Sequence, residues 1–253
     1  MSRITHDDLG LKCLKKRRAQ ELTEANRAVR FQRAKKLLDM YPEDKVDFIW
    51  FTDEKVFTVA IQKNLQNDRL YVPATVKKKH VAAERLLRTR MTFSRSVMVS
   101  VGVSKLGCTD LIFVDPGVKI NGAYYRDGLL SQQLLPTMRD VSGEFFIFQQ
   151  DSAPANRAHN TVRLLEQATP AFIPPDLWPP NSPDLNADDY KIWGIMQQRV
   201  YQSRVNNVDE LKQRLLDVWH CMEQSITDSA IDEWRWRLHS CVKAKGGHFE
   251  QLV

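Results

Sequence analysis

Two short apolar runs of the sequence each end in an aspartate. Residues 46–53 read Val-Asp-Phe-Ile-Trp-Phe-Thr-Asp, and residues 145–151 read Phe-Phe-Ile-Phe-Gln-Gln-Asp. Such runs are typical of buried strands, so we expect Asp53 and Asp151 at strand ends, on the edge of a sheet. Residues 181–190 form a third acidic stretch. Because Mg²⁺ prefers oxygen ligands, three converging carboxylates favour a two-metal site for phosphoryl transfer.

Three ordered motifs surround these acids. They are Phe51-Thr52-Asp53-Glu54, then Gln150-Asp151-Ser152-Ala153-Pro154-Ala155-Asn156, then residues 178–186 followed by Asp189-Tyr190. In this order, and over roughly residues 46–202, the chain resembles the Tc1/mariner superfamily of DNA transposases. The resemblance therefore covers more than half of the sequence.

The resemblance implies a catalytic triad of Asp53, Asp151 and Asp189. The third acid follows the Ser-Pro-Asp-Leu motif by a fixed offset, which selects Asp189 over Asp184 and Asp188. Between Asp151 and Asp189 lie 37 residues, a gap similar to that of the maT-like branch of mariner elements. The resemblance also implies that the triad holds two Mg²⁺ ions, for which Mn²⁺ substitutes.

The elements that would position these acids can be traced along the chain. Strand-forming runs at 48–52, 56–60 and 69–72 predict an antiparallel meander, and further strands are expected at 96–103, 110–114, 145–150 and 171–173. Apolar spacing predicts helices at 123–141, 160–168, 188–202, 211–222 and 225–241. A mixed sheet flanked by helices is the ribonuclease H-like α/β fold that the resemblance also implies. The catalytic domain is expected to cover residues 46–253, with its C-terminal helices starting near residue 208.

Other residues near the acids allow two interpretations. Glu54 follows Asp53 directly, and since neighbouring strand residues face opposite sides of a sheet, we expect it outside the site. Asn156 and Arg157 can contact a substrate phosphate, although Asn156 can also be a polar cap. Trp178 is predicted to be a packing anchor in a proline-rich loop whose stiffness fixes the start of the Asp189 helix.

A basic stretch at about 74–95 is the second candidate DNA contact, because clustered cations can neutralise phosphates. In mariner relatives the corresponding insertion resembles a loop that clamps a partner subunit. We therefore expect contact with DNA or with a second copy of the chain, against the alternative of a solvated loop. The candidate side chains are Lys77, Lys78, Lys79, Arg85, Arg88 and Arg90.

Residues 1–45 are expected to form a basic linker region with an amphipathic helix at 22–38, formed around Leu22, Ala25, Val29, Ala34 and Leu37-Leu38. The helix can contact DNA, pack on the catalytic domain, or do both. The resemblance implies a helix-turn-helix region before this point, which the sequence lacks. A truncated or decayed gene copy, or a fragment of a longer protein, would explain this.

Composition agrees with a globular protein of 253 residues. Hydrophobic residues make up 43% and charged residues 27%, and the net charge of +6 is compatible with nucleic-acid binding without demonstrating it. The four cysteines lack zinc-ligand spacing, and no apolar run is long enough to span a membrane. We expect a soluble protein, in the nucleus and with no membrane partner.

The expected activity is cut-and-paste transposition. Hydrolysis at the element's ends would expose 3′-hydroxyls that then attack target DNA. The resemblance implies terminal inverted repeats and TA target sites as DNA partners, and a homodimer on DNA. Two other classes remain open: a catalytically silent, transposase-derived DNA-binding or assembly protein, and a structure-selective nuclease that cleaves DNA without joining it.

Overall fold

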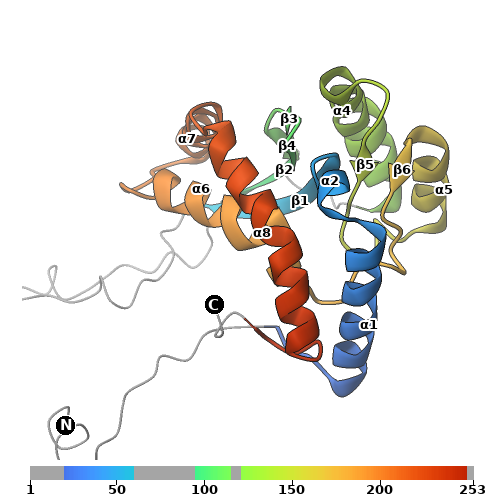
Figure 1. Ribbon diagram of the computed structural model, residues 1–253. Coiled ribbons are helices and arrows are strands. Elements are labelled where there is room, and N and C mark those ends of the chain that lie inside the picture. The colour runs from blue at the N-terminus through green and yellow to red at the C-terminus, as the bar shows by residue number, and fades with distance from the viewer. Residues whose placement is uncertain (1–19, 60–94, 115–120, 250–253) are drawn as a thin grey trace, which may run out of the picture.

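The computed structural model describes residues 20–59, 95–114 and 121–249 (Figure 1). Within these ranges six strands form one mixed sheet in the order β3-β2-β1-β5-β6, with β4 also paired to β2. Strand β1 is antiparallel to β2 and parallel to β5, and β5 is parallel to β6. The strands are β1 (Ile49–Thr58), β2 (Ser96–Ser104), β3 (Gly107–Cys108), β4 (Ile112–Val114), β5 (Ile147–Phe148) and β6 (Ala171–Phe172). This sheet confirms the predicted α/β class.

Strand β1 differs from the sequence prediction. It runs unbroken from Ile49 to Thr58, so the predicted division into strands at 48–52 and 56–60 is wrong. Asp53 consequently lies in the middle of a strand and not at its end. The cause is the length of β2, which pairs with β1 from Phe51↔Val103 to Thr58↔Ser96 and leaves no room for a turn. The predicted strand at 69–72 lies outside the described residues.

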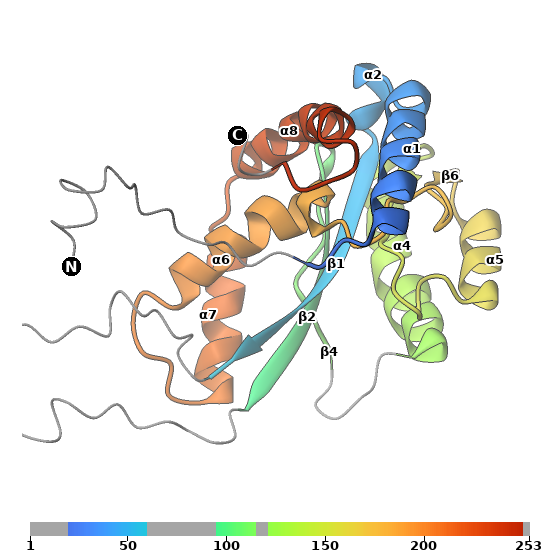
Figure 2. The same cartoon turned by 90° about the horizontal axis from the view of Figure 1, so that it is seen from below.

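Helices cover both faces of the sheet (Figure 2). One face carries the π-helical segment η3 (Tyr124–Leu134), α4 (Leu135–Ser142) and α5 (His159–Ala168), and its core includes Trp50 and Met138. The other face carries the π-helical segment η5 (Asp188–Ile192), α6 (Trp193–Val200), α7 (Val208–His220) and α8 (Gln224–Lys243). There Phe51 packs edge-on against Trp234, with ring centroids 5.5 Å apart. Alternate residues of β1 thus enter two different cores.

The predicted helices are confirmed within a few residues. Two of them begin as π-helical turns, and this changes which side chains face inward. In η3, Tyr125 is buried, while its neighbour Tyr124 stays partly exposed. Leu129, Leu130 and Leu134 of the same segment are fully buried.

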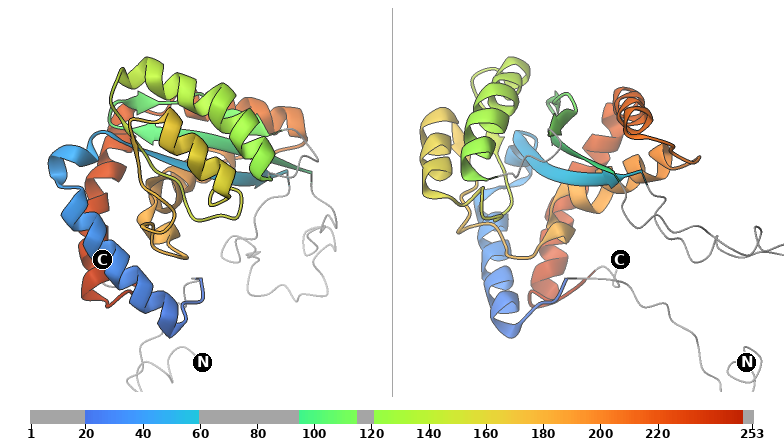
Figure 3. Two further views of the ribbon diagram at one scale, coloured as in Figure 1. Left: turned by 90° about the vertical axis from the view of Figure 1, so that its right-hand side faces the viewer. Right: turned by 180° about the vertical axis from the view of Figure 1, so that it is seen from behind.

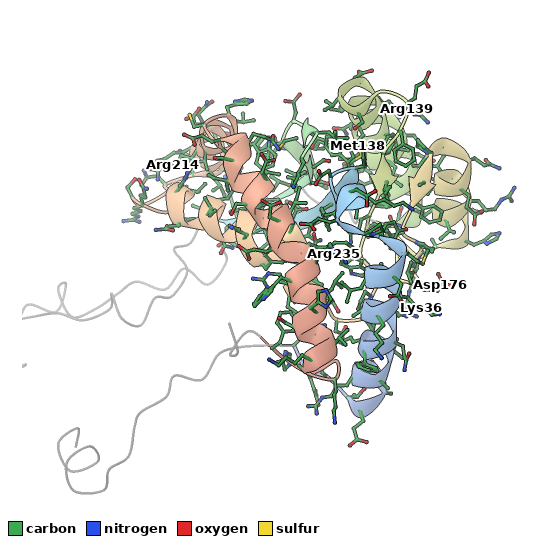
Figure 4. All side chains as sticks on the ribbon, viewed as in Figure 1. Lys36, Met138, Arg139, Asp176, Arg214 and Arg235 are labelled. Carbon is green, nitrogen blue, oxygen red and sulfur yellow. The ribbon has the colours of Figure 1, made fainter. Side chains whose placement is uncertain are left out.

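The N-terminal helix α1 (Glu24–Met40) runs beside α8, and the short α2 (Glu43–Val46) leads into β1 (Figures 1 and 3). Arg235 of α8 donates hydrogen bonds to the carbonyls of Leu38 and Tyr41 (Figure 4). The structure thus confirms that this helix packs on the α/β domain. Its buried residues include Arg30, Ala34 and Leu37, whereas Ala25 and Val29 are exposed, contrary to the predicted stripe. No helix within the described ranges is long and apolar enough to cross a membrane.

Candidate active site

The pairing of β1 with β5 brings Asp53 and Asp151 to the same level of the sheet. The last parallel pair is Trp50↔Phe148, and each aspartate lies three positions beyond its member of that pair. The segments that follow β1 residue Trp50 and β5 residue Phe148 stay together beyond this pair, because the Thr52 hydroxyl donates to the Gln149 carbonyl at 2.8 Å. Asp53 and Asp151 are therefore neighbours on adjacent segments of the sheet, as predicted.

Asp189 reaches the same place through two contacts with β1. The Asn186 side-chain amide donates to the Thr52 carbonyl at 3.1 Å, next to Asp53. One turn after Asp189, the indole nitrogen of Trp193 donates to Asp53 Oδ2 at 2.6 Å. Asp189 lies between these two contacts, which hold its turn of helix against β1.

The electrostatics show that the acids lie close together. Burial raises the pKa of Asp53 well above its usual range, and repulsion from Asp189 and Glu54 raises it further. Burial also raises the pKa of Asp189, although the nearby Lys55 opposes this shift. Lys55 Nζ lies 3.8 Å from Asp189 Oδ1. Like charges held together in a buried place favour a bound cation, which would relieve their repulsion.

Asp151 is held by its own loop. Its Oδ1 accepts hydrogen bonds from the Ala153 backbone N–H at 2.8 Å and from Asn156 Nδ2 at 2.6 Å. Behind this loop, the buried Gln150 donates to the Asn156 carbonyl at 3.0 Å and accepts from the Tyr125 hydroxyl at 2.9 Å. Tyr125, Gln150 and Asn156 thus form a connected support that fixes the position of the Asp151 carboxylate.

Two further acids near the triad face elsewhere. Glu54 lies on the opposite side of β1 from Asp53, as predicted, and accepts from the Ser100 hydroxyl at 3.0 Å. Burial raises the pKa of Glu54 to about 7. Asp188 is fully buried, and its carboxylate oxygens have no hydrogen-bond partner among the described residues. Burial raises the pKa of Asp188 well above its usual range, and repulsion from Asp53 and Asp189 raises it further.

A cleft of about 410 Å³ opens over the site. Asp151 and Asp189 line it, together with Asn186, residues of the 178–183 loop and Arg157, which is exposed. Trp178 contributes to this wall but is 2% exposed, which confirms it as a packing anchor. The cleft therefore places an arginine, which can contact a phosphate, beside two carboxylates.

The oxygen donors suit a hard divalent cation, but they do not form a closed cage. Within the described ranges, no three His, Cys, Asp or Glu side chains are close enough together to hold a metal ion. One carboxylate oxygen of Asp53 accepts a hydrogen bond from Trp193, and one of Asp151 accepts from Asn156. Asp189 forms an ion pair with Lys55. Carboxylate oxygens are nevertheless the type of ligand that Mg²⁺ and Mn²⁺ prefer.

The predicted DNA contacts fare differently from the acids. Lys77, Lys78, Lys79, Arg85, Arg88 and Arg90 lie outside the described residues. Arg157 is exposed in the cleft. Asn156 is 3% exposed and bonds to Asp151, so its position supports the carboxylate and not a phosphate contact. It does not cap α5 either, because Ala158 is the N-cap.

Sequence reasoning missed Lys55, Asn186 and Trp193. Lys55 stands two positions after Asp53 on one strand, so a period of two places it on the same face. Trp193 stands four positions after Asp189, the helical spacing that brings side chains together. Both signals were in the sequence. The contact of Asn186 with β1 joins residues 134 positions apart and has no local signal.

Comparisons with known proteins agree with this geometry. No protein-family model matches the chain. The Tcb2 transposase of a Caenorhabditis briggsae transposable element is 28% identical over 143 residues, which cover 55% of this chain and 51% of that protein. The Tcb1 transposase of the same species is 23% identical over 224 residues, covering 87% and 76%. The chain thus spans about half of the first relative and three quarters of the second.

Solved structures of the Mos1 mariner transposase share the fold. A paired-end complex with the left transposon end has a TM-score of 0.80 at 22% identity, covering 97% of this chain and 70% of that one. The isolated catalytic domain has a TM-score of 0.68 at 19% identity, with 92% and 100% covered. A paired-end complex with Mn has a TM-score of 0.77 at 20% identity, with 95% and 68% covered. The fold of this chain is accordingly the ribonuclease H-like fold of that catalytic domain.

Proposed function

We propose that this chain, a homologue of the Tc1/mariner transposases, is a catalytic domain that cuts DNA at transposon ends and joins the freed 3′-hydroxyls to target DNA. The observation that carries the proposal is that Asp53, Asp151 and Asp189 come near one another, where burial and repulsion from Asp189 raise the pKa of Asp53, and burial raises the pKa of Asp189. The relatives support it, since both are transposases of transposable elements.

The three acids are proposed to hold two divalent ions, Mg²⁺ or Mn²⁺. Structures of the Mos1 transposase with Mn and with Mg support this choice of metals. Bound there, the ions would activate the attacking oxygen and stabilise charge on the phosphate and the leaving oxygen. The chain's own residues supply the frame: Asn156 orients Asp151, and Trp193 orients Asp53.

The proposed substrates are the ends of a transposable element and a second DNA duplex. Mos1 complexes with a transposon end support DNA as the partner. Arg157 in the cleft is the described cation best placed to contact a phosphate. The basic residues of the 74–95 stretch, a TA target, a two-chain assembly on DNA and a nuclear location remain predictions from the resemblance.

The test supplies a pre-cut DNA end and a plasmid target with Mg²⁺ or Mn²⁺. We expect joined products from the unaltered chain, and a roughly thousandfold slower reaction for Asp151→Asn, since the metals contribute several kcal/mol to the rate. Asp176→Asn is the matched control, because this carboxylate is exposed (Figure 4). It should react like the unaltered chain.

Other outcomes would select the alternatives. Metal-dependent nicking without joining would show a nuclease. DNA binding with neither reaction would show a catalytically silent protein. Equal activity of Asp151→Asn and Asp176→Asn would refute the proposed site.

A further inference from the structure

Arg30 is a fully buried arginine on α1, far from the triad in sequence. Its guanidinium makes a two-pronged contact with Asp184, at 3.0 Å to Oδ1 and 2.7 Å to Oδ2. It also donates to the Ser182 hydroxyl at 2.5 Å and to the Asn181 carbonyl at 3.0 Å. Nε donates to the Gly246 carbonyl at 2.9 Å. One side chain therefore ties α1, the 181–184 segment and the turn after α8 together.

The segment that Arg30 holds leads directly to the third acid. It forms the 3₁₀ turn Pro183–Leu185 and continues through Asn186, whose side chain is hydrogen-bonded to β1. It then enters the helix that carries Asp189. Its first residue, Asn181, has φ of 50°, a left-handed conformation that a non-glycine residue keeps only when its surroundings hold it. The Arg30 bond to the Asn181 carbonyl is such a restraint.

A second α1 arginine holds the loop just upstream. Arg33 donates to the carbonyl of Trp178 at 2.7 Å and to that of Pro175 at 3.2 Å. Arg237 of α8 donates to the Asp184 carbonyl at 3.1 Å. The loop that forms one wall of the cleft is thus fastened along its length to α1 and α8.

We propose that Arg30 is a positioning residue for catalysis: acting through Asp184, it fixes the 181–186 segment so that Asp189 meets Asp53. This inference rests on the proposed function, and it makes α1 a working part of the active site. The planar fork of arginine suits the task, since it sets the direction as well as the distance of a carboxylate.

Stability alone is a weak reason for such a pair. Removing two charges from water is costly, and replacing a buried ion pair with apolar residues of similar volume is often neutral or stabilising. The double variant Arg30→Met with Asp184→Leu exploits this, because it removes the restraint without leaving a lone buried charge. It separates positioning from folding.

The experiment uses the full chain and compares this double variant with Arg27→Met. Arg27 stands one turn earlier on α1 and is exposed, so it is a matched control. We expect the double variant to unfold near the temperature of the unaltered chain, to bind Mn²⁺ at least tenfold more weakly, measured by paramagnetic resonance of free Mn²⁺, and to join DNA correspondingly slowly. Arg27→Met should change neither property.

A second variant covers the case in which the double variant does not fold. Arg30→Lys keeps the charge and loses the fork. We expect it to fold and to bind Mn²⁺ several-fold more weakly than the unaltered chain. Unchanged Mn²⁺ affinity in a folded Arg30 variant would overturn the proposal.

Hydrogen exchange in the absence of metal separates this inference from the proposed function. Faster exchange of the amides at 185–193 in the Arg30 variants, but not in Arg27→Met, would support the restraint whether or not the chain joins DNA. Unchanged exchange would overturn it in either case. A chain that neither binds Mn²⁺ nor joins DNA, yet shows the exchange difference, would refute only the proposed function and the catalytic part of the inference.

Discussion

The carboxylates of the site depend on neutral neighbours for their direction. Asp53 takes an indole N–H from Trp193, and Asp151 takes an amide from Asn156. Both donors are uncharged, so they orient an oxygen without supplying the cation that the acids call for. In the proposed site, this division of roles would leave the balance of charge to a bound metal, while the protein fixes the geometry.

Asn156→Ala tests this role at a single residue. The change removes a hydrogen bond to a charged group and leaves Asp151 with the Ala153 N–H, so we expect about tenfold slower joining of a pre-cut end. The measurement is the single-turnover rate at saturating Mn²⁺. Arg157→Ala is the comparison: it should act through DNA affinity and its salt dependence instead. An unchanged rate for Asn156→Ala would contradict the prediction.

Glu54 gives a prediction about pH. Its folded-state pKa of about 7 lies above the unfolded value of 4.5, so the folded chain binds this proton more tightly. Stability contributed by the protonated form is present below about pH 4.5 and is lost as pH rises toward 7. Glu54→Gln should therefore stabilise the protein by on the order of 3 kcal/mol at pH 8 and by nothing measurable at pH 4.

Urea unfolding at the two pH values measures this difference. The exposed Glu144→Gln should show no such pH effect. Because Glu54 faces away from the triad, Glu54→Gln should also keep its metal-dependent activity. Loss of activity would place Glu54 in the site, and equal stability at pH 8 would contradict its burial.

At the scale of elements, the helix after Asp189 can be stabilised by a substitution at one exposed glycine. Gly194 is exposed on α6, and a Cβ there would meet nothing within 4 Å. Gly194→Ala should stabilise the chain by about 0.5–1 kcal/mol, because alanine loses less backbone entropy in a helix. Thermal unfolding measures it.

Gly102→Ala is the opposite case for the same measurement. On β2 its Cβ would lie 2.6 Å from the end of Met138 and 3.4 Å from Trp50. We expect destabilisation of about 1–3 kcal/mol from overpacking. Equal effects of the two glycine substitutions would show that local space does not decide either of them.

The sequence predicted most elements because their apolar periods are strong. Strand β2, helix α7 and helix α8 were found from spacing alone. The break in β1 was predicted wrongly because Asp53, Glu54 and Lys55 look like a turn, whereas pairing with β2 holds them extended. The hydrogen bonds between β1 and β2 therefore outweigh the local preference of these residues for a turn.

The site was predicted as a set of acids but not as a set of supports. Motif resemblance selected Asp53, Asp151 and Asp189. Arg30 was overlooked, although it shares the helical spacing of Ala34 and Leu37 on the buried face of α1. A charged residue on an apolar stripe indicates a buried partner, but nothing in the local sequence identifies Asp184 as that partner.

For the whole molecule, α1 is expected to be indispensable. A chain beginning at Pro42 would lose Arg30 and leave Asp184, which is 7% exposed, without its cation. It would also lose the apolar cover of Leu37. We expect destabilisation of about 3–5 kcal/mol, as for other broken buried pairs. A chain beginning at Gln20 keeps α1 and is the control, and urea unfolding compares the two. Equal stability would contradict the prediction.

Asp53 and Phe51 share one side of strand β1, and Glu54 shares the other with Trp50. An in-frame deletion of the codon for Thr52 would place Asp53 on the opposite side of the strand from Phe51. All three aspartates would still be present in the sequence. The spacing of Phe51, Asp53 and Phe57 is therefore a sharper marker of an intact site than the presence of three aspartates.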